Sequence, residues 1–222
     1  MKLTQDELKG IEKQLSKPEG EFGIEIAKNM NESNIKMTID SIKSLKLLKS
    51  DILLEIGHGN CGHLEKIYKE ANNIKYFGLE ISETMKFEAE RINKKLIQNN
   101  EISFHLYDGI NIPFPDNNFD KIFTVNTIYF WENPLDFINE IYRVLKINGI
   151  LILTFAQKDF MKKLPFVKNK FSLYDNNDLN LLIKKTGFEI VETEKKSEKI
   201  KSKSGELVNR IFSVVKIKKN CS

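Results

Sequence analysis

Three glycines stand at short intervals directly after an apolar run, in the order Gly57-x-Gly59-x-x-Gly62. Glycine takes backbone torsions that other residues avoid, and it lets a ligand approach the main chain closely. If a helix follows the glycines, its N-terminus adds free N–H groups and the positive end of the helix dipole. The pattern therefore predicts a turn that receives a carboxylate or a phosphate.

An acidic residue, Glu80, ends the next apolar run, about 20 residues after the glycines. In the dinucleotide fingerprint, an acid at this place accepts hydrogen bonds from ribose hydroxyls. The glycines alone fit equally well a strand-to-helix turn that binds nothing. Together with Glu80 they favour a nucleoside site.

A further acid, Glu55, stands two residues before the first glycine, inside a run that is expected to be buried. A buried carboxylate is costly unless it has a partner. An ammonium group at the turn, directly or through water, would be such a partner. Because nicotinamide dinucleotides have no ammonium group and S-adenosylmethionine has one, Glu55 favours S-adenosylmethionine.

Several stretches resemble the motifs of class I S-adenosylmethionine-dependent methyltransferases, most closely the quinone-biosynthesis-like small-molecule methyltransferases. In chain order they are Glu55-x-Gly57-x-Gly59, Gly78-Leu79-Glu80-Ile81-Ser82, Tyr107-Asp108-Gly109, residues 115–122, and residues 142–150, which resemble the family's RVLKPGG helix end. The similarity covers about residues 15 to 217. It implies S-adenosylmethionine as cofactor and methyl transfer to a small-molecule acceptor.

The predicted cofactor site gathers residues that follow or end the first four expected strands: Glu55, Gly57, His58, Gly59, Glu80, Ile81, Asp108, Gly109 and Asn126. By the resemblance, Glu80 holds the ribose, Ile81 lies against adenine and Asp108 contacts the adenine amino group. His58 is placed there by its position alone, and a packing or surface role fits it as well. No metal site is expected.

Two positions depart from the family pattern. Cys61 stands where the family usually has a third glycine, so its side chain is expected near the methionine moiety. Ile147-Asn148 replaces the family's Pro-Gly before Gly149, and Asn tolerates the left-handed torsion of a helix end.

Acceptor contacts are expected at the carboxyl edge of the sheet, where ligands bind in such folds. Tyr129, Trp131 and Phe22 are the predicted substrate-binding residues, although Trp131 fits equally well as a core anchor for the next helix. Residues 17–23 and the insertion 157–173 are predicted to form a lid or static acceptor walls.

The remaining histidines are assigned other places: His63 to a helix surface and His105 to a strand. No acid–base pair stands out, so the catalytic residues stay unassigned. Holding donor and acceptor in line can supply much of the acceleration when the cofactor brings its own leaving group.

Strands that alternate with helices predict an α/β fold: a seven-stranded, mostly parallel Rossmann-like sheet with helices on both faces and an antiparallel last strand. The expected strands are 51–56, 74–80, 102–107, 121–125, 150–155, 188–193 and 207–217. The expected helices are 4–15, 22–29, 33–48, 60–71, 82–99, 134–148 and one that begins at Asn177 or Asp178 and ends at Gly187. The first helix begins with a Thr4–Glu7 capping box and a Leu3–Leu8 staple, and residues 195–203 are expected as a solvated loop. Residues 1–48 are predicted as an N-terminal helical cap or lid, and residues 49–222 as the methyltransferase domain, in one structural unit.

Composition limits the alternatives. The net charge of +4 comes almost wholly from scattered lysine, which argues against a nucleic-acid partner. The sequence has no apolar run long enough to span a membrane, no signal-peptide pattern, and two cysteines without metal-ligand spacing, so a cytoplasmic protein is expected. A nicotinamide-dependent oxidoreductase and a non-catalytic adenosine-binding domain remain the competing hypotheses, and nothing indicates the oligomeric state.

Overall fold

The computed structural model describes residues 4–201 and 207–220, and within these ranges one sheet has the strand order β3-β2-β1-β4-β5-β7-β6. The strands are β1 (Ile52–Ile56), β2 (Lys75–Glu80), β3 (Ile102–Leu106), β4 (Phe119–Val125), β5 (Leu145–Ala156), β6 (Phe188–Lys201) and β7 (Leu207–Lys219). Neighbours from β3 to β5 pair in parallel, and β7 runs antiparallel to both β5 and β6. The predicted fold class is confirmed.

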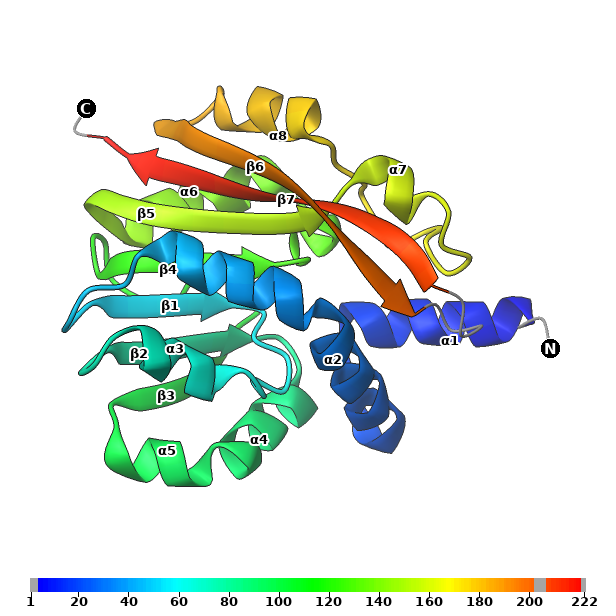
Figure 1. Cartoon of the computed structure of the whole chain (residues 1–222), viewed down its shortest axis with the longest axis horizontal. Helices are drawn as coiled ribbons and strands as arrows, with labels where there is room; N and C mark the ends of the chain where they lie inside the picture. The colour runs from blue at the N-terminus through cyan, green and yellow to red at the C-terminus, as the bar shows by residue number, and fades with distance from the viewer. Residues whose placement is uncertain (1–3, 202–206, 221–222) are drawn as a thin grey trace.

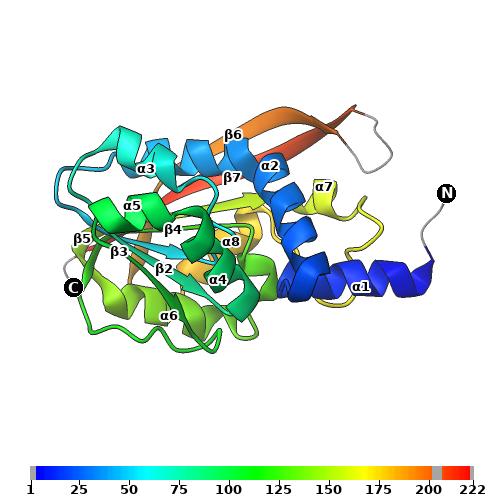
Figure 2. The same ribbon diagram turned by 90° about the horizontal axis from the view of Figure 1, so that it is seen from below.

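Helices cover both faces of this sheet. They are α1 (Gln5–Ser16), α2 (Gly20–Leu45), α3 (Leu64–Glu70), α4 (Glu83–Ile92), α5 (Lys94–Asn99), α6 (Pro134–Val144), α7 (Lys158–Met161) and α8 (Asn176–Ile183), with a 3₁₀ turn η1 at Ile128–Phe130. Figures 1 and 2 place α2 and α3 over one face and α6 over the other. Because both faces are covered, the central strands carry apolar side chains on both sides.

The parallel strands place the expected site residues at one edge. The chain order reverses at β1, which pairs with β2 on one side and β4 on the other. In open α/β sheets, the crevice outside the carboxyl ends of such strands is where ligands bind. The glycine loop after β1 therefore lies between the ends of β2 and β4.

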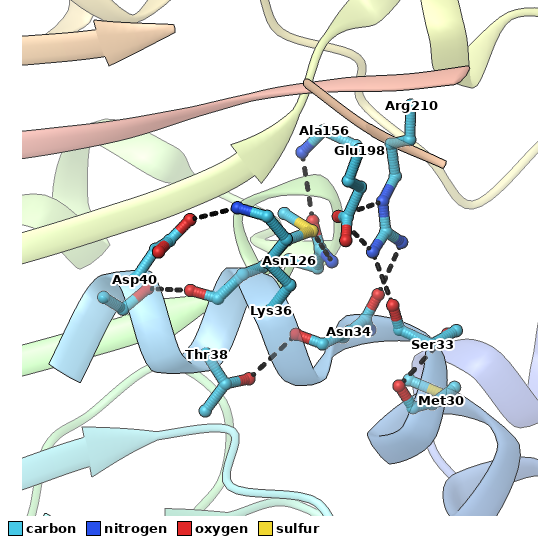
Figure 3. Close-up of polar contacts among 12 residues, drawn as sticks. Met30, Ser33, Asn34, Lys36, Thr38, Asp40, Asn126, Ala156, Glu198 and Arg210 are labelled. Atoms are coloured by element: carbon cyan, nitrogen blue, oxygen red, sulfur yellow. Dashed lines mark hydrogen bonds and ion pairs between the residues drawn. The ribbon is translucent and has the colours of Figure 1, made fainter. Parts of the chain in front are cut away.

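The N-terminal region differs from the prediction. Helix α2 is continuous over 26 residues, where an interruption was expected between Asn29 and Ser33. It changes direction about midway (Figures 1 and 2), and there the Arg210 guanidinium donates to the Ser33 carbonyl oxygen (2.6 Å) and to Asn34 Oδ1 (2.8 Å), as Figure 3 shows. Because Arg210 occupies a carbonyl of the helical ladder, the helix bends without ending. A buried ion pair with Glu198 (2.7 Å) holds the guanidinium in place.

The lysine-rich segment expected as a loop is also different. Residues 195–201 belong to β6, which stays paired with β7 from Lys195↔Ser213 to Lys201↔Leu207; residues 202 and 203 lie outside the described residues. The strand assignment depends on cross-strand pairing, which composition does not reveal. The Glu198–Arg210 pair is one of these cross-strand contacts.

Several helix and strand ends also differ from the predicted positions. Helix α6 ends at Val144, and Asn148 lies within β5; it does have the expected left-handed torsion (φ 65°). The cap of α8 is Asp175 instead of Asn177 or Asp178. The Thr4–Glu7 capping box is confirmed, while Leu3 of the expected staple lies outside the described residues.

Candidate functional site

The glycine loop has the predicted backbone character. Gly57 (φ 73°) and Gly59 (φ 56°) are both left-handed, and the Gly57 N–H donates to the Leu79 carbonyl (2.8 Å). A Cβ added to Gly57 would lie 2.4 Å from Thr127 Cγ2, whereas one added to Gly59 would meet no atom within 4 Å. Gly57 is thus required by packing, whereas the space beside the main chain of Gly59 is open.

The helix expected directly after the glycines begins later. Residues 59–60 and 62–63 form turns, and α3 starts only at Leu64 and is seven residues long. The expectation that a helix from about Asn60 offers its N-terminus to an anion is therefore wrong. Left-handed torsions at Gly59 and Cys61 (φ 48°) keep this segment out of a regular helix.

Glu80 lies where the acid of the nucleoside site was predicted, at the end of β2. It is buried, and its carboxylate accepts hydrogen bonds from the backbone N–H groups of Gly59 (3.0 Å), Ile81 (2.8 Å) and Ser82 (3.1 Å). These donors fix the side chain in one orientation beside the glycine loop. The structure thus brings Glu80, Ile81 and Gly59 together.

Asp108 and Gly109 follow β3 at the same edge. Asp108 is exposed, and its Oδ1 accepts from the N–H groups of Ile110 (2.8 Å) and Asn111 (2.7 Å). Hydrogen bonds from the Asn111 backbone and side chain, with that of Ile110, lower the pKa of the Asp108 carboxyl. Gly109 is left-handed (φ 86°), and a Cβ there would lie 3.5 Å from Ile81 Cγ2, so Gly109 lies next to the residue predicted to contact adenine.

A pocket lies beside Ile81. Its lining comes from the turn before α2, the start of α4 and the end of β3: Lys17, Glu19, Ile81, Glu83, Thr84, Leu106 and Tyr107. The Gly20 N–H donates to Thr84 Oγ1 (3.2 Å), and Ser82 Oγ donates to the Pro18 carbonyl. These contacts attach the segment before α2 to the carboxyl edge of β2.

Asn126 follows β4 and is left-handed (φ 59°). Its Oδ1 accepts from the Ala156 N–H (3.1 Å; Figure 3) and from the Tyr129 hydroxyl (3.0 Å). Tyr129 is buried, its hydroxyl also contacts the Ala156 carbonyl (2.9 Å), and its ring lies 5.8 Å from that of Phe171 in the insertion. Burial raises the pKa of Tyr129, so the hydroxyl stays protonated.

The other two predicted acceptor residues, Trp131 and Phe22, differ in their exposure to solvent. Trp131 is buried with its ring 4.8 Å from that of Phe137 on α6, as expected for a core anchor. Its Nε1 has no hydrogen-bond partner among the described residues. Phe22 lies in the first turn of α2 and is 48% exposed.

Glu55 is buried, as predicted, and the protein supplies partners of its own. The Tyr76 hydroxyl donates to Glu55 Oε2 (2.6 Å), and His63 Nε2 lies 2.9 Å from the same oxygen. Burial raises the pKa of Glu55, but His63 and Tyr76 outweigh it, so the pKa lies below its usual value. The assignment of His63 to a helix surface is wrong, because the residue is buried (4% exposed).

His58 packs inward. Its ring is buried, lies 4.8 Å from the Phe104 ring, and its Nδ1 contacts the Gly59 carbonyl (2.8 Å). Burial lowers the pKa of His58, which keeps the imidazole neutral. His105 is in β3, as predicted.

The sequence analysis did not predict a contact between α1 and the insertion 157–173. Glu12 of α1 is buried, and its Oε1 accepts from the backbone N–H groups of Lys168 (3.2 Å), Asn169 (2.7 Å) and Lys170 (2.8 Å). It therefore joins α1 to the insertion 157–173. A single acid in an amphipathic helix gives no signal of a partner more than 150 residues away.

Comparison with known proteins also indicates a methyltransferase domain. A family model described as "Methyltransferase domain" matches residues 54–153, which include the glycine loop and Glu80. YrhH of Bacillus subtilis (strain 168), which is named as a methyltransferase, is 33% identical over 108 residues, or 49% of this chain and 59% of that protein. The chain spans about three fifths of the length of YrhH and of YdaC, a second relative from the same organism.

Solved structures share the fold. A SAM-dependent methyltransferase from Aquifex aeolicus has a TM-score of 0.62 at 21% identity, with 97% of this chain and 99% of that chain covered. A chain from the complex between the Haloferax volcanii Trm112 methyltransferase activator and a methyltransferase has a TM-score of 0.70 at 13% identity, with 88% and 94% covered. Across residues 4–201 and 207–220, none of the helices has the length and apolar character needed to cross a membrane. Residues 54–153 are thus similar to a methyltransferase domain, and the described residues share the fold of solved S-adenosylmethionine-dependent methyltransferases.

Proposed function

We propose that the protein transfers the methyl group of S-adenosylmethionine to a small-molecule acceptor. The observation that carries this proposal is the Glu80 carboxylate, which is buried beside the open main chain of Gly59. A carboxylate has about four lone-pair sites, so the three backbone donors leave Glu80 about one site for a ribose hydroxyl. This is the geometry expected of a nucleoside site.

The other cofactor contacts follow from the order of the strands. Ile81 and Gly109 border the adenine, and Asp108 accepts from its amino group. Glu55, at the end of β1, faces the methionine ammonium. Asn126, fixed by Ala156, closes the site from β4.

The cofactor supplies an activated methyl group and its own leaving group. The protein then has to orient the two reactants and keep water out, and correct positioning accounts for much of the acceleration in such reactions. The acceptor would lie beyond Asn126, against the aromatic group of Tyr129, Phe130 and Phe171, whose neighbouring rings are 4.7 to 6.1 Å apart. No general base is assigned, because Tyr129 stays protonated and His58 is buried in packing contacts.

Residues 1–48 act as a cap on this site in the same proposal. The first half of α2 carries the exposed Phe22 and follows a turn attached to α4. Glu12 joins α1 to the insertion 157–173, so these two segments are held together beside the proposed site. A cytoplasmic location remains part of the proposal.

The test is a thermal shift with S-adenosylhomocysteine. A ligand that binds only the folded state stabilises it by about 2.7 kcal/mol at a hundredfold excess over its dissociation constant. We expect S-adenosylhomocysteine to raise the Tm and NADH to leave the Tm unchanged. The absence of a shift at millimolar ligand would remove the proposal, and a shift with NADH alone would favour the oxidoreductase. Binding without turnover across an acceptor library would indicate a non-catalytic adenosine-binding domain.

A further inference from the structure

Beneath the glycine loop, four buried side chains form a connected polar network. Tyr76 in β2 contacts Cys61 Sγ through its hydroxyl (3.3 Å) and donates to Glu55 Oε2 (2.6 Å). His63 Nε2 lies 2.9 Å from the same Oε2. All four residues are at most 4% exposed. Such a network stabilises a fold only when its members are satisfied, so its geometry is highly constrained.

Both contacts to Glu55 use one oxygen. Tyr76 and His63 each lie at Oε2, and Oε1 takes part in neither contact. An ionised carboxylate has about four lone-pair sites on its two oxygens. Because the carboxylate is ionised, His63 donates to it through Nε2–H. Glu55 is therefore held from one side and keeps Oε1 for another partner.

Cys61 gives a second, independent observation. Its φ of 48° is left-handed, where a residue with a Cβ is strained by roughly 1 kcal/mol and glycine is not. The side chain is nevertheless present and fully buried against the Tyr76 hydroxyl. Cys61 thus limits the positions open to that hydroxyl and, through it, to Glu55.

We propose that His63 and Tyr76, with Cys61 behind Tyr76, are positioning residues that orient Glu55 toward the ammonium group of the cofactor's methionine moiety. The inference rests on the proposed function. Glu80 lies at the end of β2 and serves the ribose, so the cation is left to Glu55 at the end of β1. A buried carboxylate favours a cationic ligand group over a neutral one.

The same atoms offer a second interpretation, a metal ion. Ligand atoms of Glu55, Cys61 and His63 lie within 4.8 Å of one another. The observations favour the network, because the Tyr76 hydroxyl lies within hydrogen-bond distance of both Sγ and Oε2.

The experiment compares two ligands in each variant by calorimetry. S-Adenosylhomocysteine carries the ammonium group, and 5′-methylthioadenosine has the same adenosine without the amino-acid moiety. We expect Tyr76→Phe and His63→Leu to weaken S-adenosylhomocysteine binding by about tenfold, or about 1.4 kcal/mol, and to change 5′-methylthioadenosine binding by less than about twofold. His63→Gln keeps an N–H donor and should recover most of the loss.

A double-mutant cycle completes the test. In the Glu55→Gln background, Tyr76→Phe and His63→Leu should have little further effect, because their action passes through the missing charge. Equal losses for both ligands, or no loss for either, would overturn the inference and leave the proposed function standing. Stoichiometric metal in the purified wild-type protein would overturn it in favour of the metal site. If the wild-type protein binds neither ligand, the proposed function itself fails. Within one variant, the ratio of the affinities for S-adenosylhomocysteine and 5′-methylthioadenosine does not depend on the folded fraction. If Tyr76→Phe folds poorly, the conservative variant His63→Gln still provides a result.

Discussion

The backbone N–H of Gly59 donates to Glu80 Oε2 over 3.0 Å, which joins the loop after β1 to the end of β2. The same loop is joined to β2 by the Gly57 N–H and the Leu79 carbonyl. The residue predicted to bind the ribose is therefore also a support of the loop predicted to border the methionine moiety. Glu80 and Glu55 should consequently differ in which ligands they affect.

Replacement of Glu80 by Ala should weaken all adenosine ligands. It removes the acceptor of three backbone donors and of a ribose hydroxyl, and hydrogen bonds to a charged partner contribute roughly 1.5 to 3 kcal/mol each. The affinity for S-adenosylhomocysteine and for 5′-methylthioadenosine should fall by about tenfold or more, measured by calorimetry. Wild-type affinity in Glu80→Ala would remove the ribose assignment.

Tyr129→Phe should leave cofactor affinity almost unchanged. Asn126 Oδ1 keeps its bond from the Ala156 N–H when the hydroxyl is lost, so Asn126 should retain its orientation. The free energy of unfolding should fall by about 1 kcal/mol, because the hydroxyl bonds inside the protein. Turnover or the apparent affinity for the acceptor should change. A large loss of S-adenosylhomocysteine affinity would move Tyr129 from the acceptor wall into the cofactor site.

Alanine at Gly57 and at Gly59 should have opposite consequences. Gly57→Ala places Cβ 2.4 Å from Thr127 Cγ2 at φ 73°, so we expect a loss of several kcal/mol in the free energy of unfolding. Gly59→Ala meets no protein atom and should cost only about 1 kcal/mol for its torsion. Its methyl group would instead occupy the open space of the predicted ligand, so S-adenosylhomocysteine affinity should fall by about tenfold or more. Denaturation and calorimetry separate the two effects, and unimpaired binding by folded Gly59→Ala would place the ligand elsewhere.

Glu12→Gln should loosen the contact between α1 and the insertion in a pH-dependent way. Burial raises the pKa of Glu12, but the N–H groups of Lys170, Asn169 and Lys168 outweigh it, so the folded-state pKa is lowered. A lowered pKa contributes stability above the unfolded-state value of about 4.3, and this contribution is lost as the pH falls through the folded-state value.

We therefore expect Glu12→Gln to be about 1.5 kcal/mol less stable than wild type at pH 7, with the difference shrinking below about pH 4. Urea denaturation at several pH values measures it. Glu25→Gln, an exposed change on α2, is the matched control and should lie within about 0.5 kcal/mol of wild type. A difference that persists unchanged at low pH would show that the charge of Glu12 is not what holds the insertion.

Local signals in the sequence were enough for the alternation of strands and helices, the left-handed glycines, the acid that ends β2 and the Thr4–Glu7 cap. Each depends on residues within a few positions of one another. The carboxyl edge of the sheet followed as well, because parallel strands bring their ends together. The family motifs are of this kind, and for that reason they could be identified without the structure.

Only the tertiary structure decided which distant groups meet. His63 turned out to be buried because the loop after β1 folds back over Glu55, and Tyr76 joins them from the next strand. Glu12 and residues 168–170 are far apart in sequence, as are Arg210 and Ser33, whose contact allows α2 to bend without ending. Such contacts depend on how whole helices and strands pack. The residue type determines how many hydrogen bonds a side chain can make, but only the tertiary packing determines which group is its partner.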